Sequence, residues 1–434
     1  MENKISNPRA LALDVLNKCE SGGYSNIALD TIIKRNDLSS ADRGLITALI
    51  YGVIERKITL DYIISSLSSI PNSKIERDTR NILRMGLHQL IYMRKIPSHA
   101  ALNETVALAN KRSKGFVNAI LRSYQREGNK IEFPNEDDQV KYLSVKYSVG
   151  EQLVCALLDA YSFTECKFML GAFEQIAPIT LRVNNLKATR EQILGELEHA
   201  RLTDFSPDGI VLDNAAVSEL VCLKDGRVTV QDEASQICIR ALDAKEGDLV
   251  LDVCACPGSK SFGAAMTMQN KGKILAFDIH ENKLSLVEKG AERLGIDIIE
   301  TQAHDARKPI EELIGKADKI ICDVPCSGFG VISKKPEIRY KDPKESARLP
   351  EIQYDILENV SNYLKIGGTL VYSTCTILPE ENENNVEKFL ENHKNFELVP
   401  FSVGELEVEE GMITLLPHRH HTDGFFIAKL KRIK

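Results

Sequence analysis

The sequence of 434 residues contains no run that approaches the roughly 20 apolar residues a membrane-spanning helix needs. The polar N-terminus, Met1-Glu2-Asn3-Lys4, lacks the profile of a signal peptide. Internal repeats and low-complexity tracts are also absent, and the 43% hydrophobic and 27% charged fractions are typical of globular proteins. We therefore expect a cytoplasmic protein that does not bind membranes, with two or three domains at this length.

Cysteines are sparse and irregularly spaced. Ten in this length do not form the dense framework of a small disulfide-rich secreted domain, so reduced thiols are expected. Zinc sites usually show paired Cys-x-x-Cys spacing, which neither Cys254 with Cys256 nor Cys322 with Cys326 provides. The nearby histidines lack ligand spacing as well. We expect no metal.

Charge is unevenly divided along the chain. Residues 1–130 carry 20 Lys and Arg against 12 Asp and Glu, a net charge of +8. Because the whole chain has a net charge of −7, residues 131–434 have a net charge of −15. A basic module beside an acidic one suggests a polyanionic partner. The same charge spread over several helices could also be only a solvated surface, and the composition does not separate these two interpretations.

The first 130 residues are predicted to form a helical bundle. Their apolar residues recur at three- and four-residue spacing, which predicts helices at 8–19, 25–34, 39–56, 59–67, 77–93, 100–110 and 115–124. Ser39 or Ser40 and Ser98 are expected to cap helices. Residues 126–138 are polar and broken by glycine and proline, which indicates a domain boundary near residue 130.

Residues 131–230 mix predicted helices at 151–158, 166–173 and 190–199 with short strands such as 179–183, so a small connecting α+β subdomain is expected. Residues 231–434 alternate strands and helices, which predicts a Rossmann-like, doubly wound sheet. The expected strands lie near 248–253, 273–278, 297–301, 318–323 and 369–375, and the expected helices near 232–243, 259–268, 280–294, 350–364 and 379–391. Residues 412–416 and 424–430 are predicted to add antiparallel edge strands.

A ligand loop is expected after the strand near 248–253. Cys254-Ala255-Cys256-Pro257-Gly258-Ser259-Lys260 forms the turn into a helix, where small residues let a ligand approach the backbone N–H groups. Neither Gly-x-Gly-x-x-Gly nor Gly-x-x-x-x-Gly-Lys-Ser/Thr occurs there, which disfavours dinucleotides and nucleoside triphosphates. S-adenosylmethionine, a nucleoside without phosphates, fits better. Asp278 is positioned to bind ribose hydroxyls, and Asp305 to reach the adenine edge, although Asp305 could also cap a helix.

Two cysteines suggest covalent chemistry. Cys326, in Asp323-Val324-Pro325-Cys326-Ser327-Gly328, follows the strand 319–322, and Cys375, in Ser373-Thr374-Cys375, ends the strand 369–372. Either thiol alone would more often be core packing. Both, however, lie at the carboxyl ends of parallel strands, where ligands collect. A thiolate adding to carbon 6 of a pyrimidine activates carbon 5 for methylation, and a second group must then release the product. Chemistry alone does not decide which cysteine attacks.

The sequence resembles the Sun/RsmB-type RNA (cytosine-5) methyltransferases of bacteria, which modify a cytidine in 16S ribosomal RNA. Residues 82–90 and 98–104 resemble a NusB-type RNA-binding bundle. The remaining signatures are Gln231-Asp232-Glu233-Ala234-Ser235, the loop 254–260, Asp323 to Gly328, Ser373-Thr374-Cys375 and Asp423-Gly424-Phe425-Phe426. The similarity covers most of the chain. It implies 16S rRNA as the partner and S-adenosyl-L-methionine as the cofactor; we expect no DNA partner and a monomer.

The resemblance also implies roles for individual residues. Cys375 is then the nucleophile, Cys326 assists product release, and Asp323 hydrogen-bonds the target base close to the methyl donor. The cofactor residues are expected to be Cys254, Ala255, Cys256, Pro257, Gly258, Ser259, Lys260, Asp278, Asp305 and Asp323. The family loop usually reads Cys-Ala-Ala-Pro-Gly, so Cys256 is a departure, but a thiol in place of a methyl is a small change and cofactor binding should survive.

Several alternatives remain at the level of sequence. The same chemistry could act on tRNA, although the NusB-like module favours rRNA. A non-catalytic ribosome-assembly factor could keep the fold, and a NAD-dependent enzyme is a more distant candidate. Lys260 could be a solvent-facing helix residue. The basic residues Lys334, Lys335 and Arg339 and the stretch 417–421 could contact RNA phosphates or simply be exposed.

Overall fold

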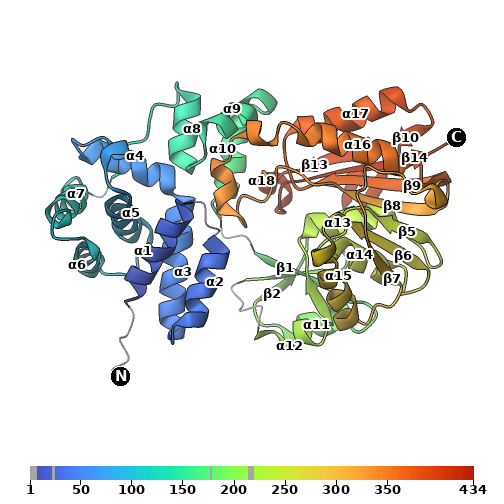
Figure 1. Ribbon diagram of the computed structural model, residues 1–434, viewed down its shortest axis with the longest axis horizontal. Coiled ribbons are helices and arrows are strands. Elements are labelled where there is room, and N and C mark those ends of the chain that lie inside the picture. The colour runs from blue at the N-terminus through green and yellow to red at the C-terminus, as the bar shows by residue number, and fades with distance from the viewer. Residues whose placement is uncertain (1–6, 22–24, 129, 176–177, 214–218) are drawn as a thin grey trace. The chain divides into compact units, whose positions relative to one another are not determined.

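The computed structural model describes residues 7–21, 25–128, 130–175, 178–213 and 219–434. It divides into two compact units. The first holds residues 1–167 with Arg339–Lys341, and the second holds 168–338 with 342–434 (Figure 1). The division at residues 130 and 230 stays a prediction about domains. Among the described residues, no helix is long and apolar enough to cross a membrane.

The first unit is helical throughout its described residues. Its helices are α1 (Pro8–Cys19), α2 (Ser25–Arg35), α3 (Ser40–Glu55), α4 (Lys57–Leu67), α5 (Arg77–Tyr92), α6 (Ser98–Leu108), α7 (Lys114–Arg126), α8 (Gln139–Tyr147) and α9 (Glu151–Ala160). The predicted helical bundle is confirmed, because buried aliphatic side chains of α1 to α7 form one core. Ser39 caps α3 by accepting a hydrogen bond from the N–H of Asp42, at 3.1 Å. Ser98 was wrongly expected as a cap: Pro97 holds that position, since the helix already includes Ser98.

A buried ion cluster joins α1, α4 and α5. Arg84 is 3% exposed, and its guanidinium donates to both carboxylate oxygens of Asp61, each at 2.6 Å. It also pairs with Glu20, which accepts from Arg80 at 3.1 Å. The hydrogen bonds and charges of both carboxylates keep the pKa of Arg84 raised although burial lowers it. The cluster thus fixes three helices through one cation.

The second unit opens with helix α10 (Phe163–Ala172), which begins in the first unit, and a small antiparallel sheet. The sheet has the order β2 (Ala200–Leu202), β3 (Gly209–Leu212), β1 (Ile179–Val183) and β4 (Val228–Val230). Helices α11 (Arg190–Glu196) and α12 (Val221–Lys224) lie along the chain between its strands. Leu181, Ile193 and Ile210 belong to its separate core. The expected small α+β subdomain is confirmed.

The large sheet confirms the Rossmann-like prediction. Its path is β10 (Phe396–Leu398), β14 (Phe425–Arg432), β9 (Leu364–Thr374), β8 (Ala317–Asp323), β5 (Leu249–Asp252), β6 (Lys273–Asp278) and β7 (Ile299–Ala303), and β13 (Met412–Leu415) also pairs with β14. Strands β5 to β9 run parallel, whereas β14 is antiparallel to β9. Residues 425–432 are therefore an interior strand and not the expected edge strand. A further pair, β11 (Phe401–Val403) with β12 (Leu406–Val408), lies apart.

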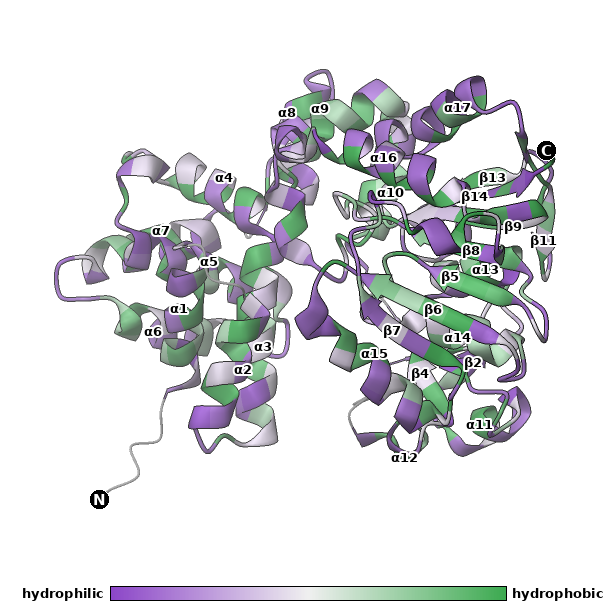
Figure 2. Ribbon diagram, turned by 45° about the vertical axis from the view of Figure 1, so that its right-hand side comes forward, coloured by the Kyte–Doolittle hydropathy of each residue, from purple (hydrophilic) through white to green (hydrophobic). Residues whose placement is uncertain are grey.

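Helices cover both faces of this sheet. The helices are α13 (Glu233–Leu242), α14 (Ser259–Thr267), α15 (Glu281–Leu294), α16 (Leu349–Ser361) and α17 (Glu383–Asn392), with the short α18 (Pro417–His420) near the end. Val250 packs in the core with α13 and α14, whereas the next residue, Leu251, packs in the core with α16. This alternation is the two-residue period of a strand buried on both faces. Figure 2 shows β5 and β6 as largely hydrophobic.

Replacing Arg84 by Ala should destabilise the helical unit by about 3 kcal/mol, because the carboxylates of Glu20 and Asp61 would lose their shared cation. The measurement is the unfolding midpoint in urea of the full chain, followed by a probe in the helical unit. Arg77→Ala is the matched control. Its side chain is half-exposed beside Asp78, so a change near zero is expected there. Equal effects of the two changes would contradict the assigned importance of the buried cluster.

Candidate active site

The turn after β5 is shaped by Gly258. Its φ is +106°, and a Cβ there would come within 2.5 Å of the Phe262 ring, so both the conformation and the space require glycine. Helix α14 begins at the next residue, Ser259, with its first N–H groups directed toward the turn. β5 is also the strand where the sheet order reverses, with β6 on one side and β8 on the other. Ligands of open α/β sheets bind at such a switch point.

Two acids from the following strands face the same pocket, which has a volume of about 490 Å³. Asp278 accepts hydrogen bonds from the N–H groups of Cys256, at 3.2 Å, and His280, at 2.9 Å. Asp305 is held by the guanidinium of Arg307, at 2.8 and 2.9 Å, and these hydrogen bonds lower the pKa of Asp305. The carboxylate oxygens of Asp278 and Asp305 are suitable acceptors for the hydroxyl and amino groups of a nucleoside.

The two cysteines meet at the other end of this pocket. Their Sγ atoms lie 3.1 Å apart, and the N–H of Cys375 points at Sγ of Cys326, at 3.3 Å. The hydrogen bond between the two thiols lowers the pKa of Cys375 against the effect of burial. The same hydrogen bond, together with burial, raises the pKa of Cys326. Cys375 is therefore the more readily ionised of the pair.

Asp323 lines the same pocket as the two thiols and pairs with a buried lysine. One carboxylate oxygen accepts from Nζ of Lys260, at 2.7 Å, and the other from Oγ of Ser373, at 2.7 Å. Lys260 is 9% exposed and also lies over the ring of Phe425, so it is not a solvent-facing helix residue. Burial alone would lower the pKa of Lys260, but the charge of Asp323 raises it overall. A fixed positive charge thus stands beside the pocket.

The backbones at Gly330 and Gly424 pass close to each other and to the backbone of Cys375. The N–H of Gly330 donates to the carbonyl of Cys375, and the N–H of Gly424 donates to the carbonyl of Gly330, both at 2.9 Å. A Cβ on Gly330 would lie 1.9 Å from the oxygen of Gly424, so no side chain fits. Backbone hydrogen bonds therefore join the loop that carries Cys326, the end of β9 and the start of β14, in addition to side-chain contacts such as the ion pair of Lys334 with Asp423.

The sequence-predicted residues occupy distinct parts of this site. Those that line the pocket are Cys254, Cys256, Asp278, Asp305, Asp323, Cys326 and Cys375. Ala255, Pro257, Gly258 and Ser259 form the turn, and Lys260 reaches Asp323 from the first turn of α14. Burial raises the pKa of Cys256 to about 12, so this unusual residue of the loop stays a neutral thiol. None of the described His, Cys, Asp and Glu residues form a group of three or more that could hold a metal ion.

Sequence reasoning missed several supporting residues. Asp252, 1% exposed, accepts from Oγ of Ser261 at 2.6 Å, and burial raises the pKa of Asp252 to about 7. Ser373 orients Asp323. The sequence contained a signal for both residues, because Asp252 ends a predicted strand and Ser373 belongs to the Ser373-Thr374-Cys375 motif. Only the contacts with Ser261 and Asp323 show what the two side chains do.

The basic residues after Cys326 have different surroundings, and Lys335 is exposed. Arg339 is 2% exposed and donates to the carbonyls of Glu55, at 2.8 Å, and Tyr147 within the helical unit, so it cannot hold RNA phosphates. Lys334 lies between the carboxylates of Asp232 and Asp423, at 2.7 Å from each.

Comparison with known proteins agrees with this geometry. The family model for 16S rRNA methyltransferase RsmB/F matches residues 239–431, the NusB family model matches 6–126, and a model for the ferredoxin-like domain of RsmF/B-like methyltransferases matches 151–218. A probable ribosomal RNA small subunit methyltransferase B of Bacillus subtilis (strain 168) is 40% identical, with 99% of each chain covered. The chain belongs to the RsmB/F family.

A further curated relative and two solved structures are also similar to this chain. The ribosomal RNA small subunit methyltransferase B of Klebsiella pneumoniae (strain 342) is 35% identical, with 99% of each chain covered. The crystal structure of PH0851 superposes with a TM-score of 0.78 at 27% identity, covering 98% of this chain and 99% of that one. A methyltransferase homolog from Pyrococcus horikoshii gives 0.60 at 28% identity over 68% of this chain and 99% of that one. As an RsmB/F member, the protein is an RNA methyltransferase that uses S-adenosylmethionine, and the acids and the Gly258 turn of the pocket fit this cofactor.

Replacing Gly330 by Ala should lower methyl transfer about 10²-fold, because a displacement of about 1 Å near the reacting groups has an effect of this size. The measurement is turnover under saturating cofactor and RNA. Gly195→Ala is the control, since a Cβ at Gly195 has no atom within 4 Å and the residue lies in α11. Full activity of Gly330→Ala would contradict the role of these close backbone contacts in holding Cys375.

The hydrogen bond between the thiols gives a second prediction. Without the donor at Cys326, the thiolate of Cys375 is less stabilised, so Cys326→Ala should raise the pKa of Cys375 and slow its alkylation at neutral pH. Mass spectrometry of iodoacetamide-treated protein over a pH series gives this pKa. Cys326→Ser keeps a hydroxyl donor and should shift the profile less. An unchanged profile in Cys326→Ala would show that the hydrogen bond does not set the ionisation.

Proposed function

We propose that this protein methylates carbon 5 of a specific cytidine in 16S ribosomal RNA through a covalent intermediate with Cys375. The observation that carries the proposal is the pair of thiols 3.1 Å apart, one with a lowered pKa, beside the carboxylate of Asp323. Carbon 5 of cytosine is a weak nucleophile until a thiolate adds at carbon 6. The arrangement supplies such a thiolate and a second sulfur within its reach.

Each residue then has a defined task. The thiolate of Cys375 forms a bond to carbon 6, and Asp323, fixed by Lys260 and Ser373, hydrogen-bonds the polar edge of the base. S-adenosylmethionine supplies the methyl group that carbon 5 takes up. The carbon 5 proton then passes to a base, its bonding electrons form the double bond between carbons 5 and 6, and Cys375 is expelled from carbon 6 as a thiolate. Cys326 assists this release of the methylated cytidine.

The cofactor is proposed to lie along the carboxyl ends of β5, β6 and β7. Asp278 would accept from the ribose hydroxyls and Asp305 from the adenine amino group, while the turn at residues 254–260 receives the amino-acid end. The basic helical unit, which matches the NusB family, favours rRNA over tRNA as the substrate. A non-catalytic assembly factor would have no need for paired thiols beside a carboxylate held by Lys260 and Ser373.

The test combines methyl transfer with adduct formation. Wild type, Cys326→Ala and Cys375→Ala are incubated with S-adenosylmethionine and unmodified 16S rRNA, and adducts that survive denaturation are scored. We expect Cys375→Ala to lose both transfer and adduct, since the attacking sulfur is gone, and Cys326→Ala to accumulate an adduct that cannot be released.

Other outcomes would change the proposal in specific ways. The reverse pattern would exchange the roles of the two cysteines. Transfer to tRNA but not to 16S rRNA would assign the rival substrate, and no transfer to naked or assembling ribosomal RNA or to tRNA would favour the assembly factor. Position of the methyl group on the pyrimidine is read from the digested nucleosides.

A further inference from the structure

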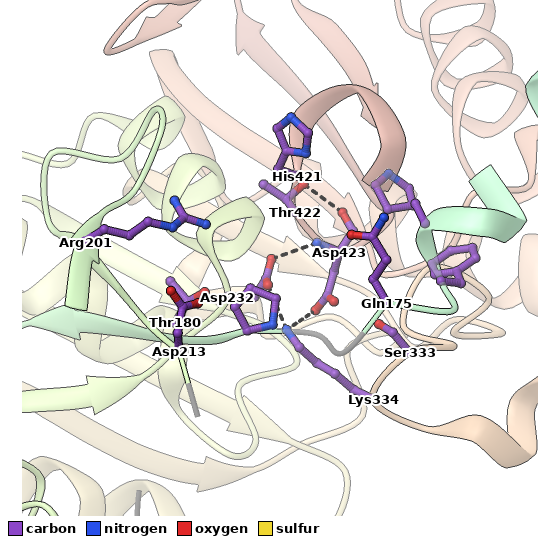
Figure 3. A pocket seen from close by; sticks show the side chains of 14 residues that line it. Gln175, Thr180, Arg201, Asp213, Asp232, Ser333, Lys334, His421, Thr422 and Asp423 are labelled. Carbon is purple, nitrogen blue, oxygen red and sulfur yellow. Dashed lines mark hydrogen bonds and ion pairs between the residues drawn. The ribbon is translucent and has the colours of Figure 1, made fainter. Parts of the chain in front are cut away.

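A second pocket lies in the same unit as the active site, outside the residues assigned to cofactor and catalysis. It has a volume of about 280 Å³ and is lined by the segment after α10, the small antiparallel sheet, the start of α13, the loop after Cys326 and the segment before β14 (Figure 3). Among the lining residues, Thr180 and Arg201 belong to the sheet and Lys334 belongs to the loop. His421 and Asp423 belong to the segment before β14. Neither the proposed reaction nor the cofactor uses these side chains.

The floor of this pocket is an ion cluster in which Asp423 is buried and Lys334 stays partly exposed. Lys334 bridges Asp232 and Asp423, and the N–H of Asp423 donates to Asp232 at 3.3 Å. Burial and the charge of Asp232 raise the pKa of Asp423 to about 7. Because two carboxylates already surround the cation, the floor does not attract a phosphate. The ion cluster instead joins Asp232, the N-cap residue of α13, to Lys334 in the loop after Cys326.

The walls offer both donors and acceptors of hydrogen bonds. In Figure 3, Arg201, Asp213 and Thr180 stand on one side, and His421 and Gln175 on the other. The side chain of Arg201 is half-exposed, 3.6 Å from Asp204. Mixed donors and acceptors around a small polar hollow suit the edge of a nucleobase, which carries ring nitrogens, carbonyls and amino groups side by side.

An aromatic surface adjoins the pocket. Phe168 is 62% exposed, and its ring stacks on His418, with 6.4 Å between ring centroids and 16° between planes. His418 follows Pro417, which lines the pocket. Exposed aromatic rings beside polar groups are the usual platform for unstacked bases in single-stranded RNA.

The pocket is tied to the nucleophile through backbone. Asp423 precedes Gly424, which bonds to Gly330, and Gly330 bonds to Cys375. Two hydrogen bonds therefore separate the wall of this pocket from the residue that is proposed to attack the cytidine. This short distance along the backbone places the pocket where a nucleotide next to a target base at Cys375 would reach it.

We infer that this pocket binds the base of a nucleotide that flanks the target cytidine in an unpaired stretch of RNA. The inference rests on the proposed function for the position of the target base. It assigns to Arg201 and His421 contacts with that flanking base, and to the Lys334 cluster the positioning of the wall. The pocket thereby contributes to the choice of the target site.

The test uses short fragments of the RNA that the wild type methylates, each with one abasic nucleotide beside the target. Binding is measured by fluorescence anisotropy and turnover separately. In wild type, one abasic position should weaken binding by about tenfold, the range expected for loss of one stacked and hydrogen-bonded base. The double variant Arg201→Ala/His421→Asn should bind intact RNA about tenfold more weakly and lose nothing further with that abasic fragment.

The variants are chosen to preserve the fold. His421 has φ +56°, a conformation that Asn tolerates, and Arg201 is on an exposed edge strand. Lys224→Ala removes an exposed cation at the end of α12 in the same small sheet domain and should bind both fragments as wild type does. Equal additional losses in wild type and double variant, or no flanking position that matters, would overturn the inference. Failure of wild type to methylate any fragment would instead reject the proposed function, whereas binding to unmodified 16S rRNA fragments would still test the pocket.

Discussion

The parallel pairing of β8 with β9 is the constraint on which the active site depends. Its register sets Asp323 opposite Ser373, so the chains that leave the two strands carry Cys326 and Cys375 to the same place. Side chains alternate between the faces of a strand, and a slip of one residue would send Ser373 to the other face and break its hydrogen bond to Asp323. The thiols, 49 residues apart in sequence, therefore meet because of strand register.

Charge is arranged around this register in pairs. Lys260 with Asp323 and Lys334 with Asp232 and Asp423 each place one cation against carboxylates in little-solvated surroundings. Such pairs hold together only where the geometry is good and further hydrogen bonds satisfy the remaining atoms, which Ser373 provides for Asp323. They also fix the directions in which the functional groups point, an advantage for catalysis because little reorganisation is then needed during reaction.

Where the periodicity of apolar residues was strong, the sequence predicted the bounds of helices and strands to within a few residues. Helices α1 to α7, α9 and the five parallel strands lie close to where apolar spacing predicted them, whereas α8 was not predicted. The errors have local physical causes. Ser98 falls inside α6 because Pro97 is suited to the position before the first helical residue, and residues 425–432 are interior because β10 and β13 both pair with β14. The sequence suggested that Arg339 could be a surface cation, but its guanidinium is buried and donates hydrogen bonds to carbonyls at the ends of α3 and α8.

The sequence by itself determined the class of fold, the motifs at strand ends and, through their similarity to known enzymes, the family. These are properties of short segments, in which spacing and residue type carry the information. Only the tertiary structure decided which cysteine is more easily ionised, what Lys260 and Lys334 bind, and that a second polar pocket adjoins the nucleophile. Those properties depend on contacts between residues 49 to 102 positions apart, which the topology and register of the sheet bring together.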